Sequence, residues 1–315
     1  MKKTLAILIA LVMVFTCASA MAELTFTTGG PTGTYYAFGS VLANYITNNA
    51  NLPVTAVVGN GSADNIDQLD LGDAQLALVQ NDVANYAYNG IRIYEDSGAV
   101  TSFTALAALY TETVQLVTCN PEIKSVADLA GKSVSIGSSG SGVYFNALDF
   151  LAAYDMSLDD ITAQYLSFGD SAEALKDGKV DAAFVVAGHP TPAVTDLSTT
   201  TETYLVGLDA EHVAKLKEIN SAYAETIIPA GTYSGIDEDI VTVGMKATII
   251  ANGDVSDEEA YAIVSTIFDN AAAISELHDK GNELDLEYAS TCGVPYHAGA
   301  AKYFAEKGFT VDVVE

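Results

Sequence analysis

The stretch Thr27–Tyr36, which reads TTGGPTGTYY, indicates more about the fold than any other segment of this sequence. A short strand, Leu24–Thr27, is expected to lead into it. After it, apolar residues recur at the spacing of one helix face, at Phe38, Val41, Leu42, Tyr45 and Ile46. A strand, a glycine-rich loop and a helix start place free backbone N–H groups around one point, which is an arrangement that binds anions. The alternative is an ordinary β-to-α turn whose glycines only permit positive φ angles.

A second loop of the same kind lies near the middle of the chain. Val134–Ile136 is expected to form a strand, and Gly137–Gly142 (GSSGSG) then opens a helix that continues to about Tyr154. A dinucleotide-binding pattern fails here, because Phe145 stands where the third glycine is required. The loop is therefore either a ligand loop rich in hydroxyl groups or a capped turn. Two similar strand–loop–helix units predict two lobes that face each other, with both loops at one cleft.

Strand and helix patterns alternate along the rest of the chain, which predicts α/β sheets with helices on their faces. Further strands are expected over Val54–Val58, Leu76–Val79, Thr104–Tyr110, Thr113–Cys119, Val180–Val186 and Val241–Ala251. Capping pairs predict three more helix starts, at Ser125 with Asp128, at Asp170 with Glu173, and at Ser256 with Glu259. The last of these pairs opens a long helix that is expected to run over about 257–277.

The chain is strongly acidic, with 41 Asp and Glu residues, 13 Lys and Arg residues and a net charge of −28 at pH 7. Nucleic acids and anionic membrane surfaces need a basic footprint, so the charge argues against both as partners. Arg92 is the only arginine. An anionic ligand must therefore be held mainly by backbone amides, hydroxyl groups or lysine.

The first 20 residues have the pattern of a secretion signal. Lys2 and Lys3 precede the apolar run Leu5–Val14, and small residues allow cleavage after Ala20 or Ala22. No later apolar run reaches the roughly 20 residues that a membrane-spanning helix needs. We therefore expect an exported protein without direct membrane insertion, and the sequence leaves open whether Cys17 carries a lipid.

No motif for catalysis or cofactor binding is found. The sequence lacks a Gly-x-Ser-x-Gly nucleophile turn, a zinc spacing among its four histidines and a calcium loop, so an enzyme is disfavoured and no cofactor or metal is expected. His189 is either a turn residue or a ligand contact, and Asp82 either caps a helix or binds an ammonium group. Cys119 and Cys292 form either a disulfide or two buried thiols.

Five segments, in register over nearly the whole exported chain, resemble the TAXI receptors, which are the extracytoplasmic solute-binding subunits of TRAP transporters. They are TGG (28–30) with GTYY (33–36), GSADN (61–65), ALVQND (77–82), DLAGKSVSIG (128–137) with SG (141–142), and GKVDAAF (178–184) with GHP (188–190). The resemblance implies a periplasmic binding protein-like fold of type II, in which two crossing strands join two α/β lobes around a ligand cleft. The chain departs from the family at Val143, where a threonine is frequent.

The resemblance also implies how the chain is divided and which residues bind the ligand. Lobe I would comprise residues 23–116 and 243–315, lobe II residues 117–242, and the crossings Thr113–Cys119 and Val241–Ala247. The ligand-binding residues would be Gly30, Thr32, Thr34, Tyr35, Asn65, Gln80, Ser138, Ser139, Gly140, Ser141, Gly142 and His189.

The function implied by the resemblance is that of a periplasmic, monomeric receptor. It would bind a small carboxylate, glutamate or a related C4–C5 diacid, and deliver it to a TRAP-type membrane permease. One alternative is a receptor of an ATP-driven (ABC) importer for a sulfonate or an aromatic precursor. The other is an exported enzyme or sensor module that uses the same cleft.

Overall fold

The computed structural model describes residues 23–314, so the expected signal sequence and Cys17 lie outside the described residues. One mixed sheet of ten strands runs through the molecule in the order β2-β1-β3-β10-β4-β7-β5-β6, with β8 paired to β4 and β9 paired to β10. The strands are β1 (Leu24–Thr27), β2 (Val54–Val57), β3 (Leu76–Gln80), β4 (Phe103–Thr118), β5 (Ser133–Ser135), β6 (Thr162–Gln164), β7 (Ala182–Ala187), β8 (Tyr204–Val206), β9 (Ala224–Ile228) and β10 (Ile240–Asn252).

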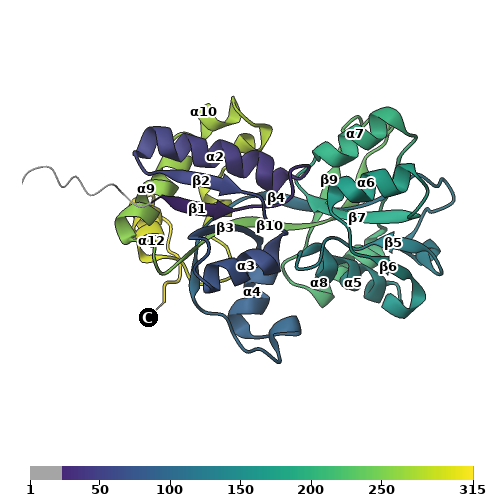
Figure 1. Ribbon diagram of the computed structural model, residues 1–315, viewed down its shortest axis with the longest axis horizontal. Coiled ribbons are helices and arrows are strands. Elements are labelled where there is room, and N and C mark those ends of the chain that lie inside the picture. The colour runs from purple at the N-terminus through teal and green to yellow at the C-terminus, as the bar shows by residue number, and fades with distance from the viewer. Residues whose placement is uncertain (1–22, 315) are drawn as a thin grey trace, which may run out of the picture.

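Helices cover both faces of each half of this sheet, and the two halves stand side by side (Figure 1). The first lobe is the half built on β1, β2 and β3, and the second lobe is the half built on β5, β6 and β7. The first lobe carries α2 (Thr34–Ala50), α3 (Ser62–Asp70), α4 (Asn81–Asn89), α9 (Asp257–Phe268), α10 (Ala271–Ser275), α11 (Leu286–Ala289) and α12 (Ala298–Glu306). The second lobe carries α5 (Val143–Ala153), α6 (Phe168–Lys176), α7 (Pro192–Thr200) and α8 (Ala210–Ile219).

Each lobe has its own apolar core. In the first lobe α2 and the strands bury Phe26, Phe38 and Leu42 completely, and in the second lobe α5 and β7 bring Phe150 against Phe184. The strands inside each lobe pair in parallel, as β1 does with β2 and β3, and β5 with β6 and β7. The predicted α/β class with two lobes is therefore confirmed.

Two long antiparallel strands, β4 and β10, connect the lobes. They pair with each other over 103–113 of β4 and 244–252 of β10. Strand β3 flanks β10 on the other side, and β7 and β9 pair with the remaining parts of β4 and β10. The prediction of two separate strands over Thr104–Tyr110 and Thr113–Cys119 is wrong. The polar residues Thr111 and Glu112 continue the ladder by pairing with Lys246 and Met245, so one strand spans the whole segment.

Two helix predictions also need correction. The helix expected over 257–277 ends at Phe268, because the backbone leaves the helical path at Asn270. Asp269 at this end accepts a hydrogen bond from Tyr303 (2.8 Å) and pairs with Lys307 (2.7 Å). The helix expected to begin at Asp170 begins at Phe168 instead. Its cap is Ser167, whose hydroxyl accepts a hydrogen bond from the Asp170 amide.

Other local predictions are confirmed. Ser125 with Asp128 and Ser256 with Glu259 form capping boxes, in which each side chain of the pair bonds to the backbone of the other residue. Cys119 and Cys292 are free thiols and not a disulfide, although Cys119 is only partly buried and not buried as the alternative expected. Cys292 lies fully buried in the core of the first lobe.

Candidate functional site

The site is a cavity of about 200 Å³ between the two lobes. Three loops supply most of its wall: the β1–α2 loop (29–35), the β2–α3 loop (58–62) and the β5–α5 loop (138 and 141–143). Each of these loops follows the carboxyl end of a parallel strand, which is where α/β sheets bind ligands. The cavity thus brings together the two glycine-rich loops, one from each lobe.

Two helix starts reach this cavity without any side-chain cap. Helix α2 begins after Gly33 and α5 begins after Gly142, and these glycines have no side chain that could accept a hydrogen bond from the first turn. The first turn of α2 also contains no acidic residue, and neither does that of α5. The free N–H groups and the positive ends of two helices therefore face a common space, one from each lobe.

Backbone contacts between the lobes close the rim of the cavity. The carbonyl oxygen of Gly140 in the second lobe accepts hydrogen bonds from the amides of Ala63 and Asp64, both at 3.0 Å, and so caps α3 of the first lobe. In return, the carbonyl oxygen of Thr32 accepts a hydrogen bond from the amide of Ala193 at the start of α7 (3.2 Å). The two lobes are therefore in direct contact around an internal space.

The cavity wall contains most of the residues that the sequence singled out. Gly30, Thr32, Thr34, Tyr35, Gln80, Ser138, Ser141 and Gly142 line it. Asn65, Ser139, Gly140 and His189 lie outside its lining. No lysine or arginine lines the cavity within residues 23–314, so its polar groups are amides, hydroxyls and one carboxyl.

Asn65 supports the site from behind. Its side-chain amide is fully buried and donates to the carbonyl oxygens of Thr28 (2.6 Å) and Leu78 (2.7 Å), while its oxygen accepts from the Thr27 hydroxyl (3.0 Å). These bonds join the ends of β1 and β3 to α3. Asn65 therefore fixes the first loop in position without contacting the cavity.

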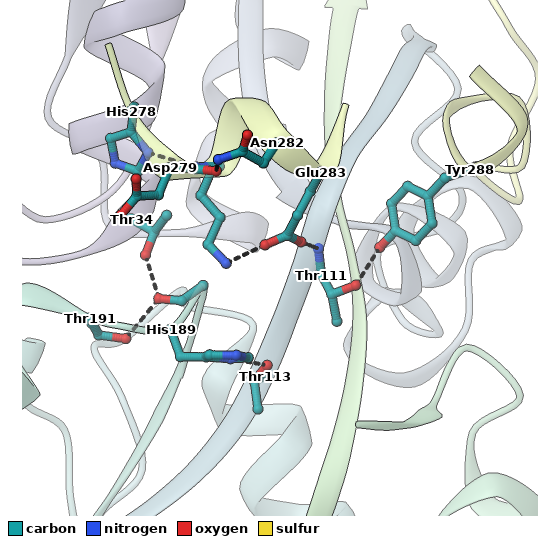
Figure 2. Close-up of polar contacts among 12 residues, drawn as sticks. Thr34, Thr111, Thr113, His189, Thr191, His278, Asp279, Asn282, Glu283 and Tyr288 are labelled. Atoms are coloured by element: carbon teal, nitrogen blue, oxygen red, sulfur yellow. Dashed lines mark hydrogen bonds and ion pairs between the residues drawn. The ribbon is translucent and has the colours of Figure 1, made fainter. Parts of the chain in front are cut away.

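His189 lies where the two connecting strands pass between the lobes (Figure 2). Its Nδ1 is 2.9 Å from the Thr113 hydroxyl on β4, and burial lowers the pKa of its ring. The hydroxyl groups of Thr34 and Thr191 both donate to the carbonyl oxygen of Gly188, one from each lobe. This polar cluster joins the lobes beside the crossing strands.

Glu112 is a cavity residue that sequence reasoning missed. It lies on β4, it is 2% exposed, and its side chain contributes the one carboxyl of the cavity wall. The available signal was a single acid between Thr111 and Thr113 in a segment that is otherwise strongly apolar. An acid at such a position is rarely buried unless it has a partner or a function.

Asp82 does not line the cavity but lies between the lobes beside it. Its Oδ1 accepts from the amide of Val83 (2.8 Å), and its Oδ2 accepts from the side-chain amides of Asn220 (3.1 Å) and Asn146 (3.3 Å) of the second lobe. Burial raises the pKa of Asp82 from 3.8 to about 6, and the charge of Asp149 adds to this effect. Asp82 therefore binds to the first turn of α4 and to two side chains of the second lobe, and so contributes to the contact between the lobes.

A pH dependence of stability follows from the raised pKa of Asp82. The folded protein holds the proton more tightly than the unfolded chain, so this group contributes stability below pH 3.8 that is lost as the pH rises through about 6. We expect the unfolding free energy of the wild type, relative to Asp82→Asn, to fall by up to about 3 kcal/mol between about pH 4 and pH 7. Urea titrations of both proteins across this range measure the difference, and a difference that is constant or rises with pH would contradict the expectation.

Among residues 23–314, no group of three or more His, Cys, Asp and Glu side chains is placed to hold a metal ion. None of the helices in that part of the chain combines the length and the apolar character needed to cross a bilayer.

The fold is shared with solved structures of solute-binding proteins. The alkanesulfonate-binding protein SsuA of Xanthomonas axonopodis pv. citri is 16% identical, with a TM-score of 0.51 over 92% of each chain. PhnD1 of Prochlorococcus marinus, solved with methylphosphonate, is 12% identical, with a TM-score of 0.55 over 83% of this chain and 90% of that one. The GluR0 ligand-binding core of Nostoc punctiforme, solved with L-glutamate, is 15% identical, with a TM-score of 0.50 over 83% of this chain and all (100%) of that one.

These likenesses, together with a cavity between two lobes, define the class of protein as one with the type II periplasmic binding protein-like fold. The chain belongs to the NMT1-like family, whose model matches residues 26–308.

Proposed function

We propose that this protein is an extracytoplasmic solute receptor that binds one small oxyanion between its lobes and delivers it to a membrane permease. The observation that carries the proposal is the convergence of two uncapped helix starts, from α2 and α5, on one cavity that lysine and arginine do not line. Backbone N–H groups and helix dipoles there can hold an anion without a cationic side chain. Hydrogen bonds to a charged group contribute about 1.5–3 kcal/mol each, so a few of them are sufficient for binding.

The choice of oxyanion is guided by Glu112. A second carboxylate of a diacid would share the cavity with this buried acid, and like charges at short distance repel strongly when water is excluded. A ligand with a single acidic group avoids this conflict. The fold shared with alkanesulfonate- and phosphonate-binding proteins points in the same direction, to a sulfonate or phosphonate receptor of an ABC-type importer.

The second candidate is the TRAP-type receptor for glutamate or a C4–C5 diacid. It is favoured by the five TAXI-like segments of the sequence, which include two loops of the cavity wall, at 28–36 and 137–142. A permease gene beside the receptor gene, with or without an ATPase gene, would discriminate between the two transport systems.

In either system, closure of two lobes would trap the solute. We propose lobe I as residues 23–116 with 243–315 and lobe II as residues 117–242, which places Gly30 and Gly142 on opposite sides of the closing cavity. The receptor would act in the periplasm as a non-catalytic monomer, and it would release its solute to the permease when the lobes separate.

A thermal melting screen tests the proposal. A solute at 100 times its dissociation constant adds about 2.7 kcal/mol to the stability of a receptor, which corresponds to a rise of several degrees in Tm. We expect such a rise with at least one of the alkanesulfonates, alkylphosphonates, amino acids, monocarboxylates and diacids. If none of these oxyanions raises Tm at millimolar concentration, the proposed function is wrong.

An ion pair between the lobes provides a test of closure. Arg92 Nη2 of the first lobe lies 2.8 Å from Asp149 Oδ1 of the second, and the Asp149 side chain is only 3% exposed. Burial raises the pKa of Asp149, and Arg92 opposes that effect. In Arg92→Met, closure leaves Asp149 buried without its cation, which is costly, whereas the separated lobes leave it hydrated.

We therefore expect Arg92→Met to weaken binding of the best oxyanion from the melting screen by about 10- to 100-fold, as measured by calorimetry. Lys215→Met, which removes an exposed i,i+4 ion pair with Glu211 within α8, is the matched control and should leave affinity unchanged. Equal affinities for Arg92→Met and wild type would show that the ion pair does not contribute to closure.

A further inference from the structure

The carboxyl group of Glu112 is buried without an ion-pair partner among the described residues, and the Tyr35 hydroxyl is the neighbour that stabilises its ionised form. Glu112 is 2% exposed and lines the cavity, yet its Oε1 has no hydrogen-bond partner among the described residues. The hydroxyl oxygens of Tyr35 and Ser141, which line the same cavity, are also buried and unpartnered there. Buried polar atoms of this kind normally find a partner, and here the cavity is the space in which a ligand can supply it.

The cavity contains a place for negative charge but no positive side chain to balance its own acid. The helix starts of α2 and α5 attract the anionic end of a ligand. Near Glu112, by contrast, the wall offers a carboxyl and the phenol of Tyr35, with the phenol of Tyr110 behind it; burial first and the charge of Glu112 second raise the pKa values of both phenols. The charge of Lys280 also acts on Glu112, but Lys280 lies outside the lining and is already paired with Glu283. Carboxyl oxygens beside aromatic rings form a common environment for an ammonium group.

We propose that the ligand is a zwitterion, and that Glu112 is the residue that binds its cationic group while the helix starts bind its oxyanion. The inference rests on the proposed function, because it assigns the second end of the same small solute. It identifies the ligand class as amino-substituted acids, such as an aminoalkylsulfonate, an aminoalkylphosphonate or an amino acid. Asp82, whose carboxyl is occupied by Val83, Asn146 and Asn220, is not needed for this role.

A neutral Glu112 that donates a hydrogen bond to the oxyanion is the competing arrangement. Burial raises the pKa of Glu112 well above its usual range and so favours the neutral carboxyl; the Tyr35 hydroxyl and the charge of Lys280 oppose this effect, and the charge of Asp82 adds to it. An ammonium group that binds there pairs with the ionised carboxylate and so opposes the effect of burial. A neutral donor keeps its proton, and a glutamine in its place still donates a hydrogen bond.

Matched pairs of probes separate these arrangements. We would measure calorimetric Kd values for 2-aminoethanesulfonate against ethanesulfonate, 2-aminoethylphosphonate against ethylphosphonate, and β-alanine against propionate. The wild type should bind the amino member of the best pair at least about 10-fold more tightly. Glu112→Gln should weaken the amino member by about 30-fold or more and leave the other member unchanged or tighter.

Two controls distinguish a specific effect at Glu112 from a general effect of removing an acid or of misfolding. Glu225→Gln, at an exposed acid on β9, should bind both members as the wild type does. The melting temperatures of the empty variants show that both fold. If the two members bind equally, or if Glu112→Gln retains the preference for the amino member, this inference is wrong while the proposed function stands. If no member of any pair binds to the wild type, the inference fails together with the proposed function.

Discussion

Replacing Gly142 by alanine is expected to weaken solute binding by about 10- to 100-fold while the empty protein stays folded. A Cβ atom at this position would lie 1.4 Å from Gln80 Oε1 and 2.5 Å from Gln80 Cδ. Gln80 cannot easily move away, because its Nε2 donates to Asn146 at 2.7 Å. Overpacking of this kind costs about 1–3 kcal/mol, and each 1.4 kcal/mol corresponds to a factor of ten in Kd.

Gln80 ends β3 in the first lobe, whereas Gly142 precedes α5 in the second lobe. The clash in Gly142→Ala therefore exists only when the two lobes are closed. The backbone at Gly142 has φ −68° and ψ −22°, which alanine adopts without strain. The unfolding free energy of the empty variant should therefore stay close to that of the wild type. Small-angle scattering should show that the solute contracts the wild type but not the variant.

Gly253→Ala is the control for this substitution. Gly253 follows β10, and a Cβ atom added there would meet no heavy atom within 4 Å. It should leave affinity and shape unchanged. Wild-type affinity in Gly142→Ala would mean that the solute binds without the closed contact between α5 and β3.

Replacing Asn65 by alanine is expected to lower the unfolding free energy by about 3 kcal/mol or more. The substitution removes two donated hydrogen bonds, to Thr28 and Leu78, and one accepted bond from Thr27, all of them buried. Each buried polar group left without a partner costs about 1–3 kcal/mol. The same loss would release the β1–α2 loop, so solute affinity should fall as well.

Urea unfolding measures this loss, with Asn49→Ala as the matched control. Asn49 is exposed on α2, and its side chain donates only to the carbonyl oxygen of Tyr45 one turn earlier. The control should change the unfolding free energy by no more than about 0.5 kcal/mol. If Asn65→Ala keeps its stability but loses affinity, then Asn65 contacts the solute directly and its supporting role is wrong.

Much of the fold was accessible from the sequence because local signals agree with the final structure. The strand at Leu24–Thr27 and the capping boxes at Ser125 and Ser256 depend on nearest neighbours along the chain, and all of them form as expected. The continuity of β4 depends instead on pairing with β10, more than 120 residues away in the chain at Met245 and Glu112. Local polarity suggested a break there, and long-range pairing overrides it.

The site was accessible only in part, for a related physical reason. Loops that end parallel strands could be placed at a common edge, so residues such as Thr32 and Ser138 were expected near one cleft. The sequence does not show which side chains turn toward that cleft: Asn65 turns back to the strand ends, and His189 turns to β4. Glu112 was missed because the sequence pattern predicted two strands with Glu112 in the gap between them. In the structure one continuous strand, β4, carries Glu112 and buries it.

A co-crystal structure with the best oxyanion from the melting screen tests the central claim most directly. We expect one solute in the cavity between the lobes, with its oxyanion within hydrogen-bond distance of the amides that begin α2 and α5. The lobes should be closed around it, with Gly140 bonded to Ala63 and Asp64. A solute bound on the outer surface, or an acidic group that points away from both helix starts, would show that α2 and α5 do not form the binding site.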